Sequence, residues 1–227
     1  MASRTGVRGV NFVYIFILAI VIFHAYLEHG LSRRLLLSLS LVPLIRGLDL
    51  AIPLASFYQL YRHVLLAVPV FLGTVGVMYL LGLGIGQIGL RFGWLPGQVG
   101  VALSGFPLGL AEYLVFRPER LVVRLGWEDL ILPGLGFLLC GFVVELIFRG
   151  IMQQTFGNAL GWPGLIYVSL TFGLVNMGHF SSLGLLVGFG MGLFFAWVVR
   201  RTGSLFGVAL AHGIAAWELY LLLPGLA

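Results

Sequence analysis

The main pattern along the 227-residue chain is a series of long apolar runs, separated by short segments that mostly carry arginine. A transmembrane helix needs about 20 mainly apolar residues, and about 17–25 are tolerated. About eight runs meet this criterion: residues 10–27, 35–56, 64–88, 98–116, 130–148, 163–180, 182–199 and 204–223. The pattern therefore predicts an all-α fold, a polytopic membrane bundle of about eight transmembrane helices.

The composition supports a membrane protein and excludes several other classes. Hydrophobic residues make up 60% of the chain and charged residues only 9%, whereas a soluble domain is about half apolar and about a quarter charged. A single cysteine, Cys140, excludes a disulfide scaffold. The loops leave no room for a soluble domain, so we expect residues 1–227 to form one integral membrane domain. The lipid bilayer is its predicted partner and the cell membrane its predicted location.

The positive charge is too sparse to indicate nucleic-acid binding. The net charge is +5, and all the basic residues are arginines that fall largely between apolar runs, where anionic lipid headgroups would meet them. Eight spans would place Arg33, Arg34, Arg91, Arg149, Arg200 and Arg201 at one end of the bundle. They would place Arg4, Arg8, Arg62, Arg117, Arg120 and Arg124 at the other. This even split leaves the membrane orientation open.

Ionisable residues within apolar runs are costly in lipid and are functional candidates. They are His24, Arg46, Asp49, Glu112, Glu145, Arg149, His179, His212 and Glu218. Arg46 and Asp49 are three residues apart, so we expect them to pair on one helix. His24 and Glu218 lie near the ends of runs, where a side chain can extend to the membrane interface.

A second pattern concerns helix packing rather than chemistry. Gly184, Gly188 and Gly192 recur every four residues and so form one smooth stripe on the predicted helix 182–199. Small residues let membrane helices approach closely. The stripe therefore predicts a tight helix–helix seam, with a hinge as the alternative.

The remaining ionisable residues gather late in the chain. Glu145 and Arg149 are four residues apart and share one helical face, His179 closes the sixth run, and His212 lies within the eighth. A carboxylate and two imidazoles can activate a water, stabilise an oxyanion or bind a metal. The spacing alone does not choose among these roles, because the three groups come from three different helices.

Around these residues the chain resembles the CPBP family of intramembrane proteases, which includes CAAX prenyl endopeptidases and bacteriocin-processing or immunity (Abi) proteins. Residues 145–150 resemble the family's Glu-Glu-x-x-x-Arg-Gly motif, and residues 169–174 resemble the start of its Phe-x-x-x-His motif. Residues 200–212 resemble the approach to its His-x-x-x-Asn motif. The resemblance covers about residues 130–223, which we take as the family-like catalytic core.

The resemblance implies an intramembrane endopeptidase that hydrolyses prenylated or hydrophobic precursor peptides. It assigns Glu145 as the base that activates water, with His179 as its partner. It assigns His212 and Asn176 to the oxyanion, and Arg149 to orientation of the carboxylate. No cofactor and no metal ligand are assigned, and the family resemblance leaves metal involvement open.

Three positions depart from the family motifs: Val144, Asn176 and Ala216 stand where the motifs have glutamate, histidine and asparagine. Val144 cannot accept a proton, and the neighbouring Glu145 points about 100° away on a regular helix. Glu145 can therefore replace the missing acid only where the helix is distorted. Asn176 can still donate a hydrogen bond, and the loss of one oxyanion donor at Ala216 costs about 10²–10³ in rate.

Three functions remain open at this stage. The first is the endopeptidase with a displaced site. The second is a catalytically inactive family member that acts as a membrane binding or chaperoning module. The third is a small transporter in which Glu112, Glu145 and the histidines line an ion path, although no inverted repeat is visible between the two halves of the chain.

Overall fold

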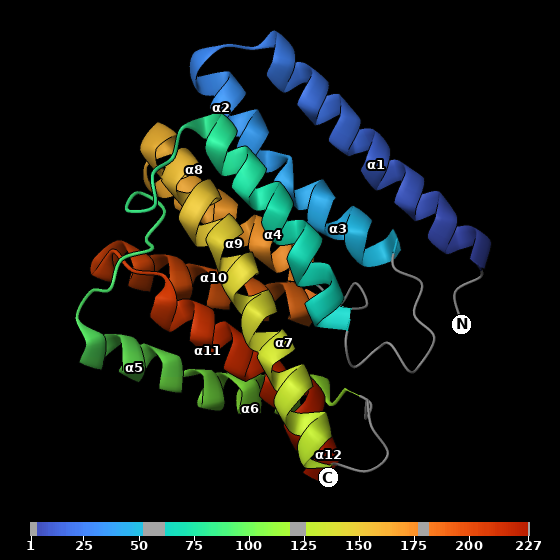
Figure 1. Ribbon diagram of the computed structural model, residues 1–227, viewed down its shortest axis with the longest axis vertical. Helices are drawn as coiled ribbons and strands as arrows, with labels where there is room; N and C mark the ends of the chain where they lie inside the picture. The colour runs from blue at the N-terminus through green and yellow to red at the C-terminus, as the bar shows by residue number, and fades with distance from the viewer. Residues whose placement is uncertain (1–3, 52–61, 119–125, 177–181, 227) are drawn as a thin grey trace.

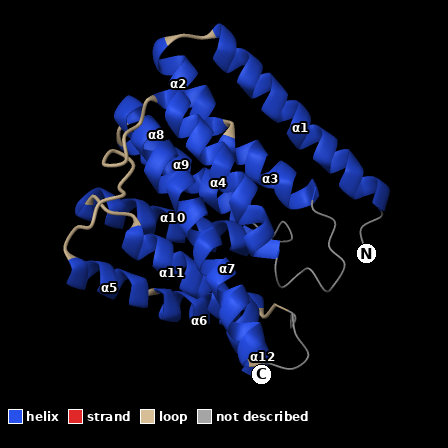
Figure 2. Ribbon diagram, viewed as in Figure 1, coloured by secondary structure: helices blue, strands red, loops and turns tan. Residues whose placement is uncertain are grey.

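A computed structural model describes residues 4–51, 62–118, 126–176 and 182–226. Within these ranges every regular element is a helix (Figure 2). The predicted all-α membrane bundle is thus confirmed.

Apart from α4 (Arg62–Leu81), which packs on α7 (Trp127–Glu145), the helices of the first half form two opposite edges of the molecule (Figure 1). They are α1 (Arg4–Leu27), α2 (Gly30–Leu39), α3 (Leu41–Ala51), α4 (Arg62–Leu81), α5 (Leu95–Leu103) and α6 (Gly105–Phe116). α1 packs on α2 and α3 at one edge, while α5 and α6 pack on α11 at the other. The predicted run 35–56 is divided at Ser40, and the run 98–116 is divided at Ser104.

The second half supplies the centre of the bundle. It contains α7 (Trp127–Glu145), the π-helix η2 (Leu146–Met152), α8 (Gln153–Leu160), α9 (Trp162–Asn176), α10 (Ser182–Thr202), α11 (Phe206–Trp217), the π-helix η4 (Glu218–Leu222) and α12 (Leu223–Leu226). α7 packs on both α4 and α11, and α9 packs on α10. The continuous helix from α7 through η2 to α8 therefore connects the two halves.

Five helical segments among the described residues are long and apolar enough to cross a membrane. They are His63–Leu81, Leu95–Phe116, Leu130–Leu160, Ser182–Thr202 and Phe206–Leu226. Val13–Leu27 and Trp162–Val175 are shorter apolar helices. Large apolar side chains such as Phe16, Leu72 and Leu186 are more than half exposed, as expected for surfaces that face lipid rather than water.

The predicted run 64–88 is longer than the helix it forms, because α4 ends at Leu81. Gly82 has a φ of +63°, and the N–H of Leu83 donates to the carbonyl of Met78 at 3.1 Å. A left-handed glycine with this hydrogen bond is a Schellman-type helix end. Residues 83–94 consequently form a loop at the end of the bundle instead of a further helical turn.

The predicted glycine seam is confirmed between α9 and α10. A Cβ atom added to Gly188 would lie 3.0 Å from the Cα of Gly173, and one added to Gly192 would lie 2.9 Å from the carbonyl oxygen of Ser169. All three glycines of the stripe are buried. The two backbones therefore touch along this face, as small residues permit in membrane helices.

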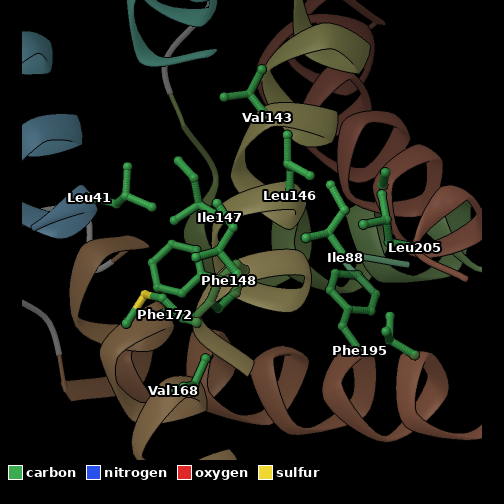
Figure 3. Packing of buried hydrophobic residues seen from close by; sticks show 14 of the residues in the cluster. Leu41, Ile88, Val143, Leu146, Ile147, Phe148, Val168, Phe172, Phe195 and Leu205 are labelled. Carbon is green, nitrogen blue, oxygen red and sulfur yellow. The ribbon is translucent and has the colours of Figure 1, made fainter. Parts of the chain in front are cut away.

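The main hydrophobic core surrounds η2 (Figure 3). Ile147 and Phe148 from η2 are fully buried and pack among Phe172 of α9, Phe195 of α10 and Leu205 before α11. The rings of Phe148 and Phe172 meet edge to face, with centroids 5.2 Å apart. Dense packing at this point fixes the position of the π-helical turn.

Two predictions for isolated ionisable residues have different outcomes. Arg46 and Asp49 form the expected pair, with Nη1 and Oδ2 3.3 Å apart. Glu218 does not extend to the interface: it is only 8% exposed and lies against Gly109 of α6, where an added Cβ would come within 2.7 Å of Oε2. The prediction for Glu218 was wrong because the missing side chain of Gly109 makes room for the carboxylate inside the bundle.

Candidate active site

The helix that carries Glu145 is distorted immediately after it. η2 begins at Leu146, and the N–H of Gln153 donates to the carbonyl of Phe148, five residues earlier, as in a π-helix. π-helical turns are rare and are frequently found at functional sites. The helix is therefore irregular directly after Glu145, where a displaced acid would need a departure from regular helical geometry.

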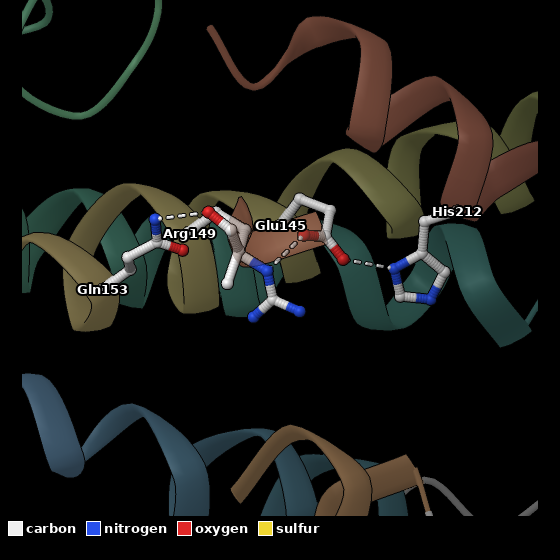
Figure 4. A network of polar contacts seen from close by, with 5 residues as sticks. Glu145, Arg149, Gln153 and His212 are labelled. Carbon is white, nitrogen blue, oxygen red and sulfur yellow. Dashed lines mark hydrogen bonds and ion pairs between the residues drawn. The ribbon is translucent and has the colours of Figure 1, made fainter. Parts of the chain in front are cut away.

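Glu145 and His212 form the shortest polar contact of the site (Figure 4). The Nδ1–H of His212 donates to Oε1 of Glu145 at 2.7 Å. The Glu145 side chain is completely buried, whereas that of His212 is 14% exposed. The imidazole thus lies between the carboxylate and the surface, and its Nε2 has no hydrogen bond to another described residue.

Close packing of α7 on α11 brings these two residues together. A Cβ added to Gly141 would lie 2.6 Å from the backbone nitrogen of Gly213, and one added to Gly213 would lie 2.6 Å from the Cα of Leu138. Glu145 follows Gly141 by one helical turn, and His212 directly precedes Gly213. The two glycines therefore set the distance between the carboxylate and the imidazole.

Replacement of Gly141 by alanine is expected to weaken this packing. The new methyl group would meet backbone atoms of α11, so the helices must move apart, and overpacking of this kind costs about 1–3 kcal/mol. Thermal unfolding of the purified protein in detergent should show a lower midpoint for Gly141→Ala. Gly190→Ala is the matched control, because a Cβ there meets nothing within 4 Å. Equal midpoints for the two variants would contradict the packing argument.

Arg149 contacts Glu145 on the side opposite His212 (Figure 4). Its Nε lies 3.3 Å from Oε2 of Glu145, and the side chains of both residues are completely buried. The guanidinium also lies over the ring of Phe172, with Cζ 4.6 Å from the ring centroid. The Glu145–Arg149 pair expected from the four-residue spacing is present, and it places two opposite charges together in an apolar core.

Aromatic rings position the imidazole of His212. Its ring centroid is 5.6 Å from that of Phe172 and 6.2 Å from that of Phe195. The carboxylate of Glu112 on α6 lies within electrostatic range of His212. The histidine is thus fixed by two rings and by its hydrogen bond to Glu145.

The structure describes less of the surroundings of the other residues that the sequence analysis singled out. His179 lies outside the described residues, and Asn176 is the last residue of α9. Val144 is partly buried and packs against the main core, while Ala216 packs beside Phe137 and Leu221 in a separate cluster. In the described part of the chain, the histidine that contacts Glu145 is His212.

Gln153 is a buried polar residue that the sequence analysis did not select. It follows Arg149 by four residues, is 8% exposed, and its Nε2 donates to the carbonyl of Ala196 on α10 at 3.0 Å. The sequence feature that could have identified Gln153 is the four-residue spacing from Glu145 through Arg149 to Gln153. Within the described ranges, no three histidine, cysteine, aspartate or glutamate side chains gather closely enough to hold a metal ion.

Comparison with protein-family models identifies the region that carries this site. Residues 126–217 match the model described as Type II CAAX prenyl endopeptidase Rce1-like. Neither the curated proteins nor the solved structures contain a match. The matched region includes Glu145, Arg149 and His212, and with the membrane-length helices it marks a multi-pass membrane protein. The chain therefore carries an Rce1-like domain at residues 126–217, which supports its membership of the CPBP family of intramembrane proteases.

Proposed function

We propose that the chain is an intramembrane endopeptidase of the CAAX-processing type that cleaves prenylated or hydrophobic peptides. The observation that carries the proposal is the 2.7 Å hydrogen bond between Glu145 and His212 inside the family domain. A carboxylate that accepts from one imidazole nitrogen fixes the tautomer and leaves the other nitrogen able to accept a proton. This arrangement is suited to general-base activation of water.

The proposed reaction uses the carboxylate and the imidazole as one unit. Nε2 of His212 takes a proton from a water molecule, and the resulting hydroxide attacks the carbonyl carbon of the peptide bond. Glu145 is fully buried, so its part is to stabilise the imidazolium that forms. The tetrahedral intermediate then breaks its C–N bond, and the proton on His212 passes to the departing amine.

Further residues have supporting parts in this proposal. Arg149 holds the Glu145 carboxylate in place through its contact at 3.3 Å. We assign Asn176 to the oxyanion, because a carboxamide can donate to the developing charge. We assign His179, which lies outside the described residues, as a second group that helps to activate the water, following the family resemblance. The whole chain is proposed to act as one domain in the cell membrane, with its family-like catalytic core at about 130–223.

The test is a cleavage assay with the full chain in liposomes. Two fluorescence-quenched peptides of the same hydrophobic sequence, one farnesylated and one not, are the substrates. Cleavage of either peptide supports the proposal, and a preference for the farnesylated one would identify a prenyl-protein substrate. If the chain cleaves neither peptide, the result contradicts the proposed endopeptidase activity.

One observation favours a second function, a catalytically inactive membrane binding or chaperoning module. The Glu145 carboxylate is enclosed between Arg149 and His212, with no exposed surface of its own. In that case the wild-type chain binds the farnesylated peptide without cleaving it, and binding persists in Glu145→Gln. Restoration of the family's acid by Val144→Glu would then produce cleavage where the wild-type chain has none.

A further inference from the structure

A polar cavity lies at one end of the bundle, beside the site but on the far side of Arg149 from His212. Its volume is about 360 Å³, and it lies between the loop after α4, the η2–α8 helix and the end of α10. The lining residues include three arginines and four side-chain amides, namely Arg91, Arg149, Arg200, Gln87, Gln153, Gln154 and Asn158. No aspartate or glutamate is among the lining residues.

The charge of this cavity is positive and only partly balanced. Among the described residues, Arg149 alone of the lining arginines has an acidic partner, Glu145. Arg91 donates from Nε and Nη2 to the carbonyl oxygen of Gly86, at 2.9 and 2.7 Å. Arg200 lies over the ring of Trp162, with Cζ 4.5 Å from the centroid. The contacts of Arg91 and Arg200 orient their guanidinium groups without neutralising them.

Two buried side chains have hydrogen-bonding atoms that the described residues do not use. Nη1 and Nη2 of Arg149, a residue only 2% exposed, make no hydrogen bond within the described ranges. Oε1 of Gln153 also has no partner there. Buried donors without partners are costly, and both residues line the cavity. The Nη donors of Arg149 fit ligand oxygen atoms, whereas Oε1 of Gln153 is an acceptor and fits a hydroxyl or N–H group.

We propose that this cavity binds a phosphate group. Guanidinium groups bind phosphate through paired, charge-assisted hydrogen bonds, and here three of them line one space at the end of a membrane bundle. The phosphate belongs either to the headgroup of an anionic phospholipid or to a free phosphate. This ligand is separate from a peptide substrate, and its binding does not require that the protein hydrolyse anything.

Binding is measured on the purified full chain in detergent. Native mass spectrometry with added phosphatidylglycerol or phosphatidylcholine tests the lipid source, and calorimetric titration with inorganic phosphate tests the free anion. Arg91→Gln and Arg200→Gln should each raise the dissociation constant about tenfold, which corresponds to about 1.4 kcal/mol. Arg201→Gln is the matched control, since Arg201 is exposed, adjacent to Arg200 and absent from the lining.

Each outcome of this experiment decides the proposal. Variant-sensitive binding of phosphatidylglycerol alone assigns the site to a lipid headgroup, and variant-sensitive binding of inorganic phosphate assigns it to a free anion. An absence of binding to either probe overturns the proposal. Equal losses in Arg201→Gln and Arg200→Gln also overturn it, because they would show general surface attraction. Unfolding midpoints of all variants are compared, so that loss of the fold is distinguished from loss of the site.

Discussion

Glu145→Gln is expected to lower kcat for peptide cleavage by about 10²–10⁴, the usual contribution of general acid–base catalysis. Glutamine keeps the size of the side chain but removes the charge that accepts from His212 at 2.7 Å. The imidazolium that forms during proton transfer then loses its stabilising partner. The measurement is the rate of cleavage of the farnesylated peptide in liposomes, with kcat and KM determined separately.

His212→Asn tests whether the two residues act together. If they form one catalytic unit, the double variant Glu145→Gln/His212→Asn should be no slower than the worse single variant, because such effects are strongly non-additive. Glu28→Gln changes an exposed acid before α2 and should leave kcat unchanged. Undiminished cleavage by Glu145→Gln would remove Glu145 from the mechanism.

Arg149→Met is expected to lower the free energy of unfolding by about 3–5 kcal/mol, since it leaves a buried carboxylate without its cation. Arg149 and Glu145 are both completely enclosed, so solvent cannot take over the role of the partner. Methionine fills much of the same volume, which limits the effect of a new cavity. Thermal or chemical unfolding in detergent measures the change.

The double variant Arg149→Met/Glu145→Gln separates charge from packing. Because it removes both charges of the pair, it should recover most of the stability that Arg149→Met loses. Arg201→Met, at an exposed position near the end of α10, should change the free energy of unfolding by no more than about 0.5 kcal/mol. A double variant as unstable as Arg149→Met would show that the arginine acts through packing alone.

Much of the fold follows from local patterns in the sequence. Long apolar runs require helices in lipid, because only helices satisfy every backbone group within a single segment. The Arg46–Asp49 pair and the glycine stripe of α10 were equally predictable, because spacings of three and four residues place side chains on one face of a helix. Contacts within one helix depend only on such spacing.

The candidate site was predictable in part. Glu145 and Arg149 share one helix, so their contact followed from spacing, whereas the hydrogen bond to His212 crosses 67 positions of the sequence. That bond exists because Gly141 and Gly213 let α7 and α11 approach closely. The burial of Glu218 against Gly109 has the same kind of cause, and its position near the end of a run gave no indication of it.

The sequence by itself therefore determined the helical membrane bundle, the family resemblance and the residues worth testing. Only the tertiary structure showed that His212 meets Glu145, where the helix widens into a π-turn, and how Arg91, Arg149 and Arg200 come to line one cavity. The physical reason is that helix formation depends on neighbouring residues. The site, by contrast, depends on how closely separate helices pack, and small residues on both partners set that distance.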